Sequence, residues 1–152
     1  MKIALGSDHA GLPLKNEIIK HLNENGIELK DFGTYTEEST DYPDYALKVA
    51  EEVAGRRYDY GILVCGTGIG ISIAANKVPG IRAALCSDTF SAHACREHNN
   101  ANILAMGQRV VGPGLAIDIV DTFLNAQFQG GRHERRINKI TAIEKKYSIG
   151  GK

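Results

Sequence analysis

A short apolar run leads straight into a glycine-rich loop in the stretch Tyr60-Gly61-Ile62-Leu63-Val64-Cys65-Gly66-Thr67-Gly68-Ile69-Gly70. The next residues predict the first turns of a helix: Ile71-Ser72-Ile73-Ala74-Ala75-Asn76. A buried strand that ends in such a loop and opens a helix points several backbone N–H groups at one spot, where negative charge is stabilised. This succession predicts a strand–loop–helix unit of an α/β fold, with a site for an anion at the loop.

Cys65 lies at the point where the predicted strand ends and the loop begins. The field of a helix N-terminus favours the thiolate form of such a cysteine. A base beside a group of N–H donors could move a proton next to a carbonyl, which favours catalysis at this loop. A lone cysteine is also often a small buried hydrophobic residue, so the loop alone leaves chemistry and packing about equally open.

Two better-known glycine motifs do not fit this loop. A Walker loop needs a Lys and a Ser or Thr directly after its last glycine, and Gly70 is followed by Ile71 and Ser72. The dinucleotide-binding motif follows the first strand of its fold, whereas this loop follows the third predicted strand and its last glycine comes one residue early. Nucleotide binding is therefore a minor alternative.

The composition indicates one domain that spans residues 1–152. The chain is 43% hydrophobic, and a chain of about 150 residues buries close to 70% of its unfolded surface without disulfides or metal. Its 18 basic residues balance 18 acidic ones, so no overall field points to nucleic acid or a membrane surface. The three cysteines include no C-x-x-C pair, which indicates a reducing cytosol. Since neither a signal peptide nor an apolar run of about 18 residues is recognisable, we expect a soluble, cytoplasmic protein.

Short apolar runs alternate with amphipathic stretches along the chain, which is typical of repeated βαβ units. We predict strands at residues 2–6, 27–32, 60–65, 81–86 and 102–106. We predict helices at residues 12–25, 42–55, 70–77, 88–98, 114–126 and 132–147. Right-handed crossovers would assemble these elements into a three-layer α/β/α sandwich around a five-stranded parallel sheet, for which we expect the strand order 2-1-3-4-5. The last helix has no strand after it and is an extra C-terminal helix.

In such sheets, ligands bind beyond the carboxyl ends of the strands, where the strand order reverses. In the order 2-1-3-4-5 this point lies between the first and third strands, so Ser7-Asp8-His9 should meet the loop that begins at Cys65. Asp8 could cap a helix with His9 beside it in solvent, or both residues could face the ligand. The polar segment 33–43 is either a surface loop or a lid.

Two polar clusters follow later in the chain. His98 stands in the last turn of a predicted helix, where it could be a partner of the helix dipole or an acid–base group. Asn99 beside it suits a sugar hydroxyl. Arg132 and Arg136 lie four residues apart on one helix face, so they could clamp a phosphate or form a solvated basic turn paired with Glu134.

Metal binding is not expected. His9, His93 and His98 share no ligand spacing. The chain also contains neither an H-x-x-x-H pair nor a Cys/His cluster.

Five motifs of the chain together carry a family resemblance. They are Gly6-Ser7-Asp8-His9-Ala10-Gly11, Asp41-Tyr42-Pro43-Asp44, Cys65-Gly66-Thr67-Gly68-Ile69-Gly70, Glu97-His98-Asn99-Asn100-Ala101-Asn102 and Gly130-Gly131-Arg132-His133. In this order they resemble the type B ribose-5-phosphate isomerases, from residue 1 to about residue 144. The resemblance implies aldose–ketose isomerisation of a small phosphosugar through an enediolate, with no metal or organic cofactor. Because relatives act on allose 6-phosphate and galactose 6-phosphate, a hexose 6-phosphate is the alternative to ribose 5-phosphate.

The resemblance also implies roles for individual residues in the chemistry. Cys65 resembles the base that moves the proton between C1 and C2. Thr67 resembles the hydroxyl that exchanges protons with the substrate oxygens. His98, with Asp8 nearby, resembles the groups that open the sugar ring. The loop residues whose N–H groups correspond to an anion hole include Gly66, Gly68 and Gly70.

The other residues carried over from the family bind the substrate. Asn99 and Tyr42 resemble residues that contact hydroxyls or line the pocket. The residues that resemble phosphate ligands are His9, Arg132 and Arg136, with Arg109 as an addition. In the family each site is shared across a dimer, which implies that His98, Asn99 and the C-terminal arginines reach the partner's Cys65 loop. We therefore expect a homodimer, with a tetramer as the alternative, and no nucleic-acid or membrane partner.

Two functions of other classes fit the same fold. A non-catalytic sensor would bind a phosphosugar or nucleotide without exchanging the C2 proton with solvent. A redox protein using Cys65 would need a second cysteine nearby, and none lies within 20 residues of it in the sequence. Residues 145–152 form a tail about which the family pattern says little.

Overall fold

Five parallel strands form one sheet in the computed structural model, which describes residues 1–148. The strands are β1 (Lys2–Ser7), β2 (Glu28–Asp31), β3 (Tyr60–Cys65), β4 (Ala83–Leu85) and β5 (Ile103–Gly107). All five lie at the predicted places, although β2 and β4 are shorter than predicted. β1, β3 and β5 consist almost entirely of buried residues, which explains their continuous apolar sequences.

The strand order is β2-β1-β3-β5-β4, so the expected order 2-1-3-4-5 is wrong in its last two positions. Every residue of β5 is buried, whereas all three residues of β4 are at least partly exposed, as suits an edge strand. Because the crossover from β4 to β5 runs back toward the centre, right-handedness sends α4 (Thr89–Asn99) to the face opposite α3 (Ile69–Ala75). Both strands are apolar in sequence, and their pattern did not distinguish the centre from the edge.

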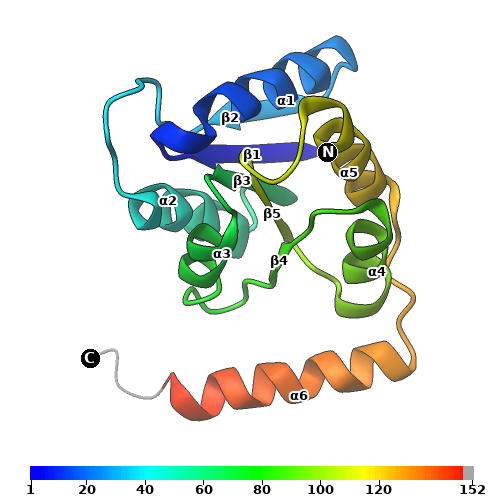
Figure 1. The fold of residues 1–152 in the computed structure, drawn as a ribbon. Helices are drawn as coiled ribbons and strands as arrows, with labels where there is room; N and C mark the ends of the chain where they lie inside the picture. Colours follow the sequence, from blue (N-terminus) through cyan, green and yellow to red (C-terminus); the bar gives the residue numbers. More distant parts are fainter. Residues whose placement is uncertain (149–152) are drawn as a thin grey trace.

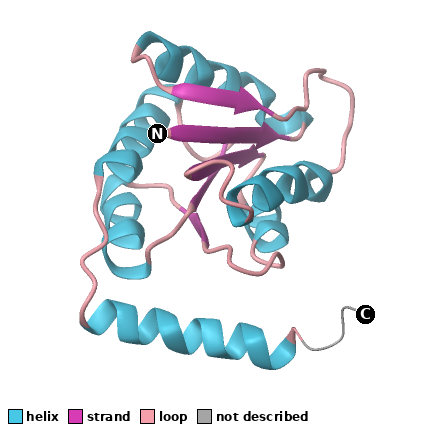
Figure 2. Cartoon of the chain, turned by 180° about the vertical axis from the view of Figure 1, so that it is seen from behind, coloured by secondary structure: helices cyan, strands magenta, loops and turns pink. Residues whose placement is uncertain are grey.

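Helices cover both faces of the sheet, which confirms the three-layer α/β/α sandwich (Figure 1). α1 (Leu12–Glu24), α4 and α5 (Pro113–Asn125) lie on one face, and α2 (Tyr42–Ala54) and α3 lie on the other. Figure 2 shows the strands as the middle layer between them. Successive strand residues serve the two cores in turn: Ile3 and Leu5 belong to the core under α1 and α5, and Ala4 belongs to the core under α2.

Two glycines let the segments after the central strands pack backbone to backbone. A Cβ at Gly107, the last residue of β5, would lie 2.5 Å from the backbone of Thr67. A Cβ at Gly11, in the short 3-10 turn η1 (His9–Gly11), would collide with the carbonyl group of Val64. These contacts leave no room for side chains, and they fix the position of the loop that begins at Cys65.

The C-terminal helix α6 (Arg132–Tyr147) lies apart from the sheet, as predicted for the extra helix (Figure 1). Its buried residues are His133 and Ile137, and the Glu144 carboxylate accepts a hydrogen bond from the Gly80 N–H. The predicted tail 145–152 begins inside this helix, and residues 149–152 lie outside the described part of the chain. Among residues 1–148, no helix is both long and apolar enough to cross a membrane.

Candidate active site

A pocket of about 250 Å³ opens beyond the carboxyl ends of β1 and β3, where the strand order reverses. Its lining residues are Asp8, His9, Ala10, Tyr42, Cys65, Gly66, Thr67, Gly70 and Arg109. They come from the end of β1, the start of α2, the loop after β3 and the turn after β5. The end of the first strand and the glycine loop therefore meet at the predicted place.

Cys65 is the last residue of β3, and it is only 4% exposed. Its Sγ accepts a hydrogen bond from the backbone N–H of Gly68 at 3.1 Å. Gly68 has a left-handed conformation (φ 78°), which turns the loop back so that this N–H points at the sulfur. An N–H donor at the sulfur stabilises negative charge there, so the geometry suits a thiolate base.

Thr67 projects from the same loop and is exposed. Its hydroxyl oxygen accepts a hydrogen bond from the backbone N–H of Ile69 at 3.2 Å. Because the oxygen accepts in this bond, the hydroxyl hydrogen is available to another acceptor. Thr67 thus brings an exchangeable proton to the pocket that holds the thiol.

Asp8 both caps a helical turn and faces the pocket, although the sequence analysis treated these two roles as alternatives. Its Oδ1 accepts a hydrogen bond from the Gly11 N–H at 3.0 Å and so caps η1. The residue is 6% exposed and lines the pocket as well. The cap therefore holds the carboxylate at the pocket wall.

His9 is held by Thr40, a residue that the sequence analysis did not single out. The His9 backbone N–H donates to the Thr40 hydroxyl, and His9 Nδ1 accepts from the Thr40 backbone N–H, both at 3.1 Å. Because Nδ1 accepts, we infer that the neutral ring carries its proton on Nε2. This tautomer lets His9 donate a hydrogen bond from Nε2 to an anion.

Tyr42 and Arg109 border the glycine loop on two sides. A Cβ at Gly70 would lie 2.6 Å from Cζ of Tyr42. A Cβ at Gly66 would lie 3.3 Å from the Arg109 guanidinium. Within residues 1–148, no carboxylate forms an ion pair with Arg109. Its positive charge is therefore available to an anion in the pocket.

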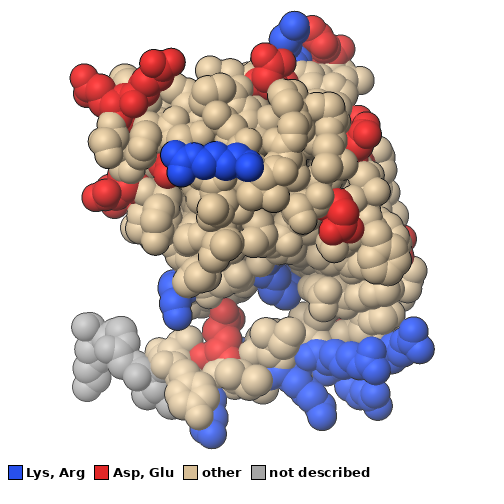
Figure 3. Space-filling view, in the orientation of Figure 1, with Lys and Arg blue, Asp and Glu red and all other residues tan. Residues whose placement is uncertain are grey.

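A second polar cluster forms where α4 ends and α6 begins. The rings of His98 and His133 are stacked, with their centroids 4.4 Å apart and their planes inclined by 10°. Burial lowers the pKa of His133, and the nearby His98, Arg132 and Arg136 lower it further. Basic side chains gather over this part of α6 (Figure 3). In the described part of the chain neither arginine pairs with Glu134, so the alternative of a paired basic turn is not seen.

The two clusters do not meet within one chain. Cys65 ends β3 at the carboxyl edge of the sheet, whereas α4 runs back against the strand direction and ends at the amino edge with Asn99. The pocket around Cys65 accordingly contains none of the four predicted residues of α4 and α6: His98, Asn99, Arg132 and Arg136. The predicted residues that do share it are Asp8, His9, Tyr42, Cys65, Gly66, Thr67, Gly70 and Arg109.

Two residues of these clusters were missed in the sequence. His133 carried a signal, because it adjoins Arg132 and precedes the buried Ile137 by one helical turn. Thr40 carried none, because its contact with His9 joins residues 31 positions apart.

Comparisons with known proteins agree with this fold and pocket. A family model described as Ribose/Galactose Isomerase matches residues 3–140. The chain therefore belongs to the ribose/galactose isomerase family, in accord with the resemblance of its motifs.

Individual relatives within this family cover nearly the whole chain. Ribose-5-phosphate isomerase B of Escherichia coli (strain K12) is 58% identical over 145 residues, which cover 95% of this chain and 97% of that protein. The structure of Clostridium thermocellum ribose-5-phosphate isomerase B matches with a TM-score of 0.96 and 62% identity, covering 97% of this chain and 99% of that one. Ribose-5-phosphate isomerase B of Mycoplasma genitalium, with bound ribulose-5-phosphate, matches with a TM-score of 0.91 and 46% identity, covering 95% and 96%.

Proposed function

We propose that the protein is an aldose–ketose isomerase that interconverts ribose 5-phosphate and ribulose 5-phosphate. The observation that carries the proposal is the Cys65 thiol, which accepts the Gly68 N–H in a pocket shared with Thr67. The relatives with this fold that are named as ribose-5-phosphate isomerases, one of them with bound ribulose-5-phosphate, support the choice of sugar.

The reaction moves a proton from C2 of the open-chain aldose to C1 and moves the carbonyl group from C1 to C2. In the proposed mechanism the Cys65 thiolate removes the C2 proton, and the electron pair passes to O1 of an enediolate. Backbone N–H groups of Gly66 and Gly70 stabilise this charge. Thr67 gives a proton to O1 and receives one from O2, and Cys65 returns its proton to C1.

The phosphate, in this proposal, is bound by positively charged and N–H-donating side chains. His9 donates from Nε2, and Arg109 supplies a guanidinium without a carboxylate partner in residues 1–148. Arg132 and Arg136 also have no carboxylate partner in residues 1–148, but they lie in the second cluster. Tyr42 lines the sugar site beside Gly70.

We also propose that two chains form a homodimer with shared sites. Since His98 and Asn99 lie outside the Cys65 pocket of their own chain, His98 of the partner subunit would supply the ring-opening acid, together with the partner subunit's Asn99. Exposed apolar side chains beside the glycine loop support a partner surface there: Ile69 is 52%, Ile73 56% and Val110 59% exposed.

Subunit mixing tests the shared site, and sedimentation distinguishes a dimer from a tetramer. Cys65→Ala and His98→Asn homodimers are each expected to be inactive. After co-refolding about half of the dimers are hybrids, each with one doubly mutated and one wild-type site, so about a quarter of all sites regain activity. No recovery despite proven hybrids would place both residues in one site of one chain.

A coupled assay of the purified protein tests the reaction itself. We expect turnover of ribose 5-phosphate that EDTA does not reduce, with deuterium entering C2 in D₂O. Turnover of allose 6-phosphate or galactose 6-phosphate in its place would assign the site to a hexose 6-phosphate. Binding without turnover would indicate a sensor. A redox role has little support, because Cys86 and Cys95 belong to the core on the other face of the sheet from Cys65.

We further propose that the chain is a single cytoplasmic domain. One sheet runs through the whole fold, and all three cysteines are free thiols, as a reducing compartment favours. Cell fractionation, together with a single cooperative unfolding transition, tests both statements.

A further inference from the structure

We propose that Lys15 is a positioning residue for substrate binding: its buried ammonium ties the turn at Asp31 and Thr34 to α1, and the segment that follows this turn holds His9 at the pocket. The proposal rests on the proposed function, because it assigns to Lys15 an effect on the phosphate that His9 binds. Lys15 itself is not among the residues that line the pocket. It acts through the chain that it anchors.

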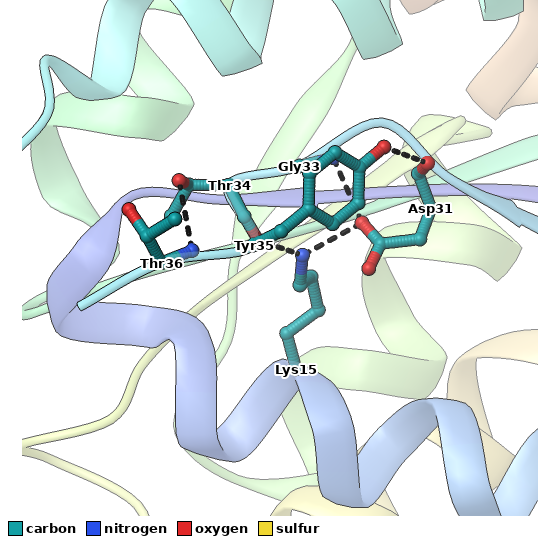
Figure 4. A network of polar contacts seen from close by, with 6 residues as sticks. All are labelled: Lys15, Asp31, Gly33, Thr34, Tyr35 and Thr36. Atoms are coloured by element: carbon teal, nitrogen blue, oxygen red, sulfur yellow. Dashed lines mark hydrogen bonds and ion pairs between the residues drawn. The ribbon is translucent and has the colours of Figure 1, made fainter. Parts of the chain in front are cut away.

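Lys15 lies on α1 and is 0% exposed, which is rare for a lysine. Its Nζ donates hydrogen bonds to Asp31 Oδ1 and to the Thr34 carbonyl oxygen, both at 2.6 Å, and lies 5.3 Å from the centre of the Tyr35 ring (Figure 4). Burial lowers the pKa of Lys15, so an ammonium here is disfavoured by desolvation. An apolar side chain would fill the same space without that desolvation. Packing alone therefore does not explain the lysine.

The turn around the ammonium is bonded both to itself and to β1. Asp31 Oδ1 also accepts from the Gly33 N–H at 2.8 Å, and the Tyr35 hydroxyl donates to the Asp31 carbonyl at 2.8 Å (Figure 4). The Ser7 N–H donates to the Gly33 carbonyl at 2.7 Å, and the Thr34 N–H donates to the Ser7 carbonyl at 2.6 Å. These bonds continue the β1–β2 pairing beyond the last residue of β2. They bring the turn to the residue before Asp8.

The far end of the same segment reaches His9. Thr40 forms the reciprocal pair of hydrogen bonds that orients the His9 ring and keeps its Nδ1 as an acceptor. Residues 35–39 between the two ends are all exposed, so the core does not hold the middle of the segment. Thr40 lies between the turn that Lys15 holds and α2, which begins at Tyr42, so the position of Thr40 is set from both ends of the segment. In the proposal the Lys15 end contributes to this position, and the direction of His9 Nε2 depends on Thr40.

Lys15→Met keeps most of the length of the side chain and removes its charge. A second change, Asp31→Asn, avoids leaving an unpaired carboxylate in the turn. We expect the double variant to raise KM for ribose 5-phosphate about 10-fold, the lower end of the effect of losing a charge-assisted hydrogen bond, with kcat changed less than about threefold. The matched control is Lys20→Met on the exposed side of α1, which should leave both constants unchanged.

A His9→Ala background separates positioning from a general loss of stability. If Lys15 acts through His9, the Lys15→Met/Asp31→Asn change raises KM in the wild-type background and leaves it unchanged in the His9→Ala background. A fall in Tm should be the same in both backgrounds. An equal rise of KM in both backgrounds, or no rise in either, would overturn the proposal.

The ring nitrogens of His9 give a readout that does not depend on activity. In ¹⁵N NMR spectra the wild type should show the tautomer with the proton on Nε2, and Lys15→Met/Asp31→Asn should shift His9 toward a mixture of tautomers. Lys15→Gln, which keeps an N–H donor, replaces the double variant if that does not fold, and it should give a smaller shift. An unchanged His9 spectrum contradicts the positioning role. A wild type that shows the Nε2 tautomer without isomerase activity would instead contradict the proposed function alone.

Discussion

Replacing Cys65 by alanine removes the proposed base and little else. The side chain is 4% exposed, and the hydrogen bond that it loses is the one from the Gly68 N–H. General-base catalysis is typically worth about 10²- to 10⁴-fold in rate, or about 2.7–5.4 kcal/mol of transition-state stabilisation. The groups proposed to bind phosphate lie on other segments, so we expect kcat to fall by this amount while KM changes little.

The assay is steady-state turnover of ribose 5-phosphate together with deuterium exchange at C2 in D₂O. Cys86→Ala is the matched control, because it removes a buried thiol from the core on the opposite face of the sheet. It should lower stability by about 1–2 kcal/mol as a small cavity and leave kcat unchanged. A Cys65→Ala enzyme within about threefold of the wild-type kcat would refute the assignment of Cys65 as the base.

Three further changes test the surroundings of the site. Arg132→Ala and Arg136→Ala should each raise KM for ribose 5-phosphate about 10–150-fold and leave turnover of unphosphorylated ribose unaffected; an equal effect on both sugars would contradict a phosphate clamp. Gly107→Ala places a Cβ 2.5 Å from the Thr67 backbone and should lower kcat about 10–100-fold, while Gly112→Ala, whose Cβ meets nothing within 4 Å, serves as the control that should not. Since the folded-state pKa of His133 is lowered, the unfolded chain binds this proton more readily, and stability should be lost as pH falls through about 6.5. Urea titrations across that pH range should show a smaller loss of stability for His133→Gln than for the wild type. Identical pH profiles of the two proteins would contradict this role of His133.

The glycine loop was predictable because its signals are local. An apolar run, a cysteine and closely spaced glycines specify the end of β3, the turn at Gly68 and the start of α3 within about a dozen positions. The same holds for the five strands and six α-helices of residues 1–148, whose hydrophobic periods are properties of neighbouring residues. The position of the pocket followed from topology, since β1 and β3 are adjacent in both the expected and the observed order.

Contacts between distant segments were not predictable in the same way. The positions of β4 and β5 in the strand order depend on which of the two strands is buried between neighbours and which lies at the edge. Because both strands are apolar, their sequences do not reveal this difference. Thr40 meets His9 across 31 positions, and Lys15 meets Asp31 across 16, without any pattern that links either pair. Capping of η1 by Asp8 shows a further limit, because one carboxylate can satisfy a local N–H and line a pocket together.

The sequence by itself determined the fold class and the family, and it predicted the candidate residues for the chemistry. Only the tertiary structure decided how these residues are divided, with the Cys65 pocket at the carboxyl edge of the sheet and the His98 cluster at the amino edge. The physical reason is the direction of the chain: a helix that connects parallel strands must run back against them, so its last residues lie at the far edge from the end of the strand before it.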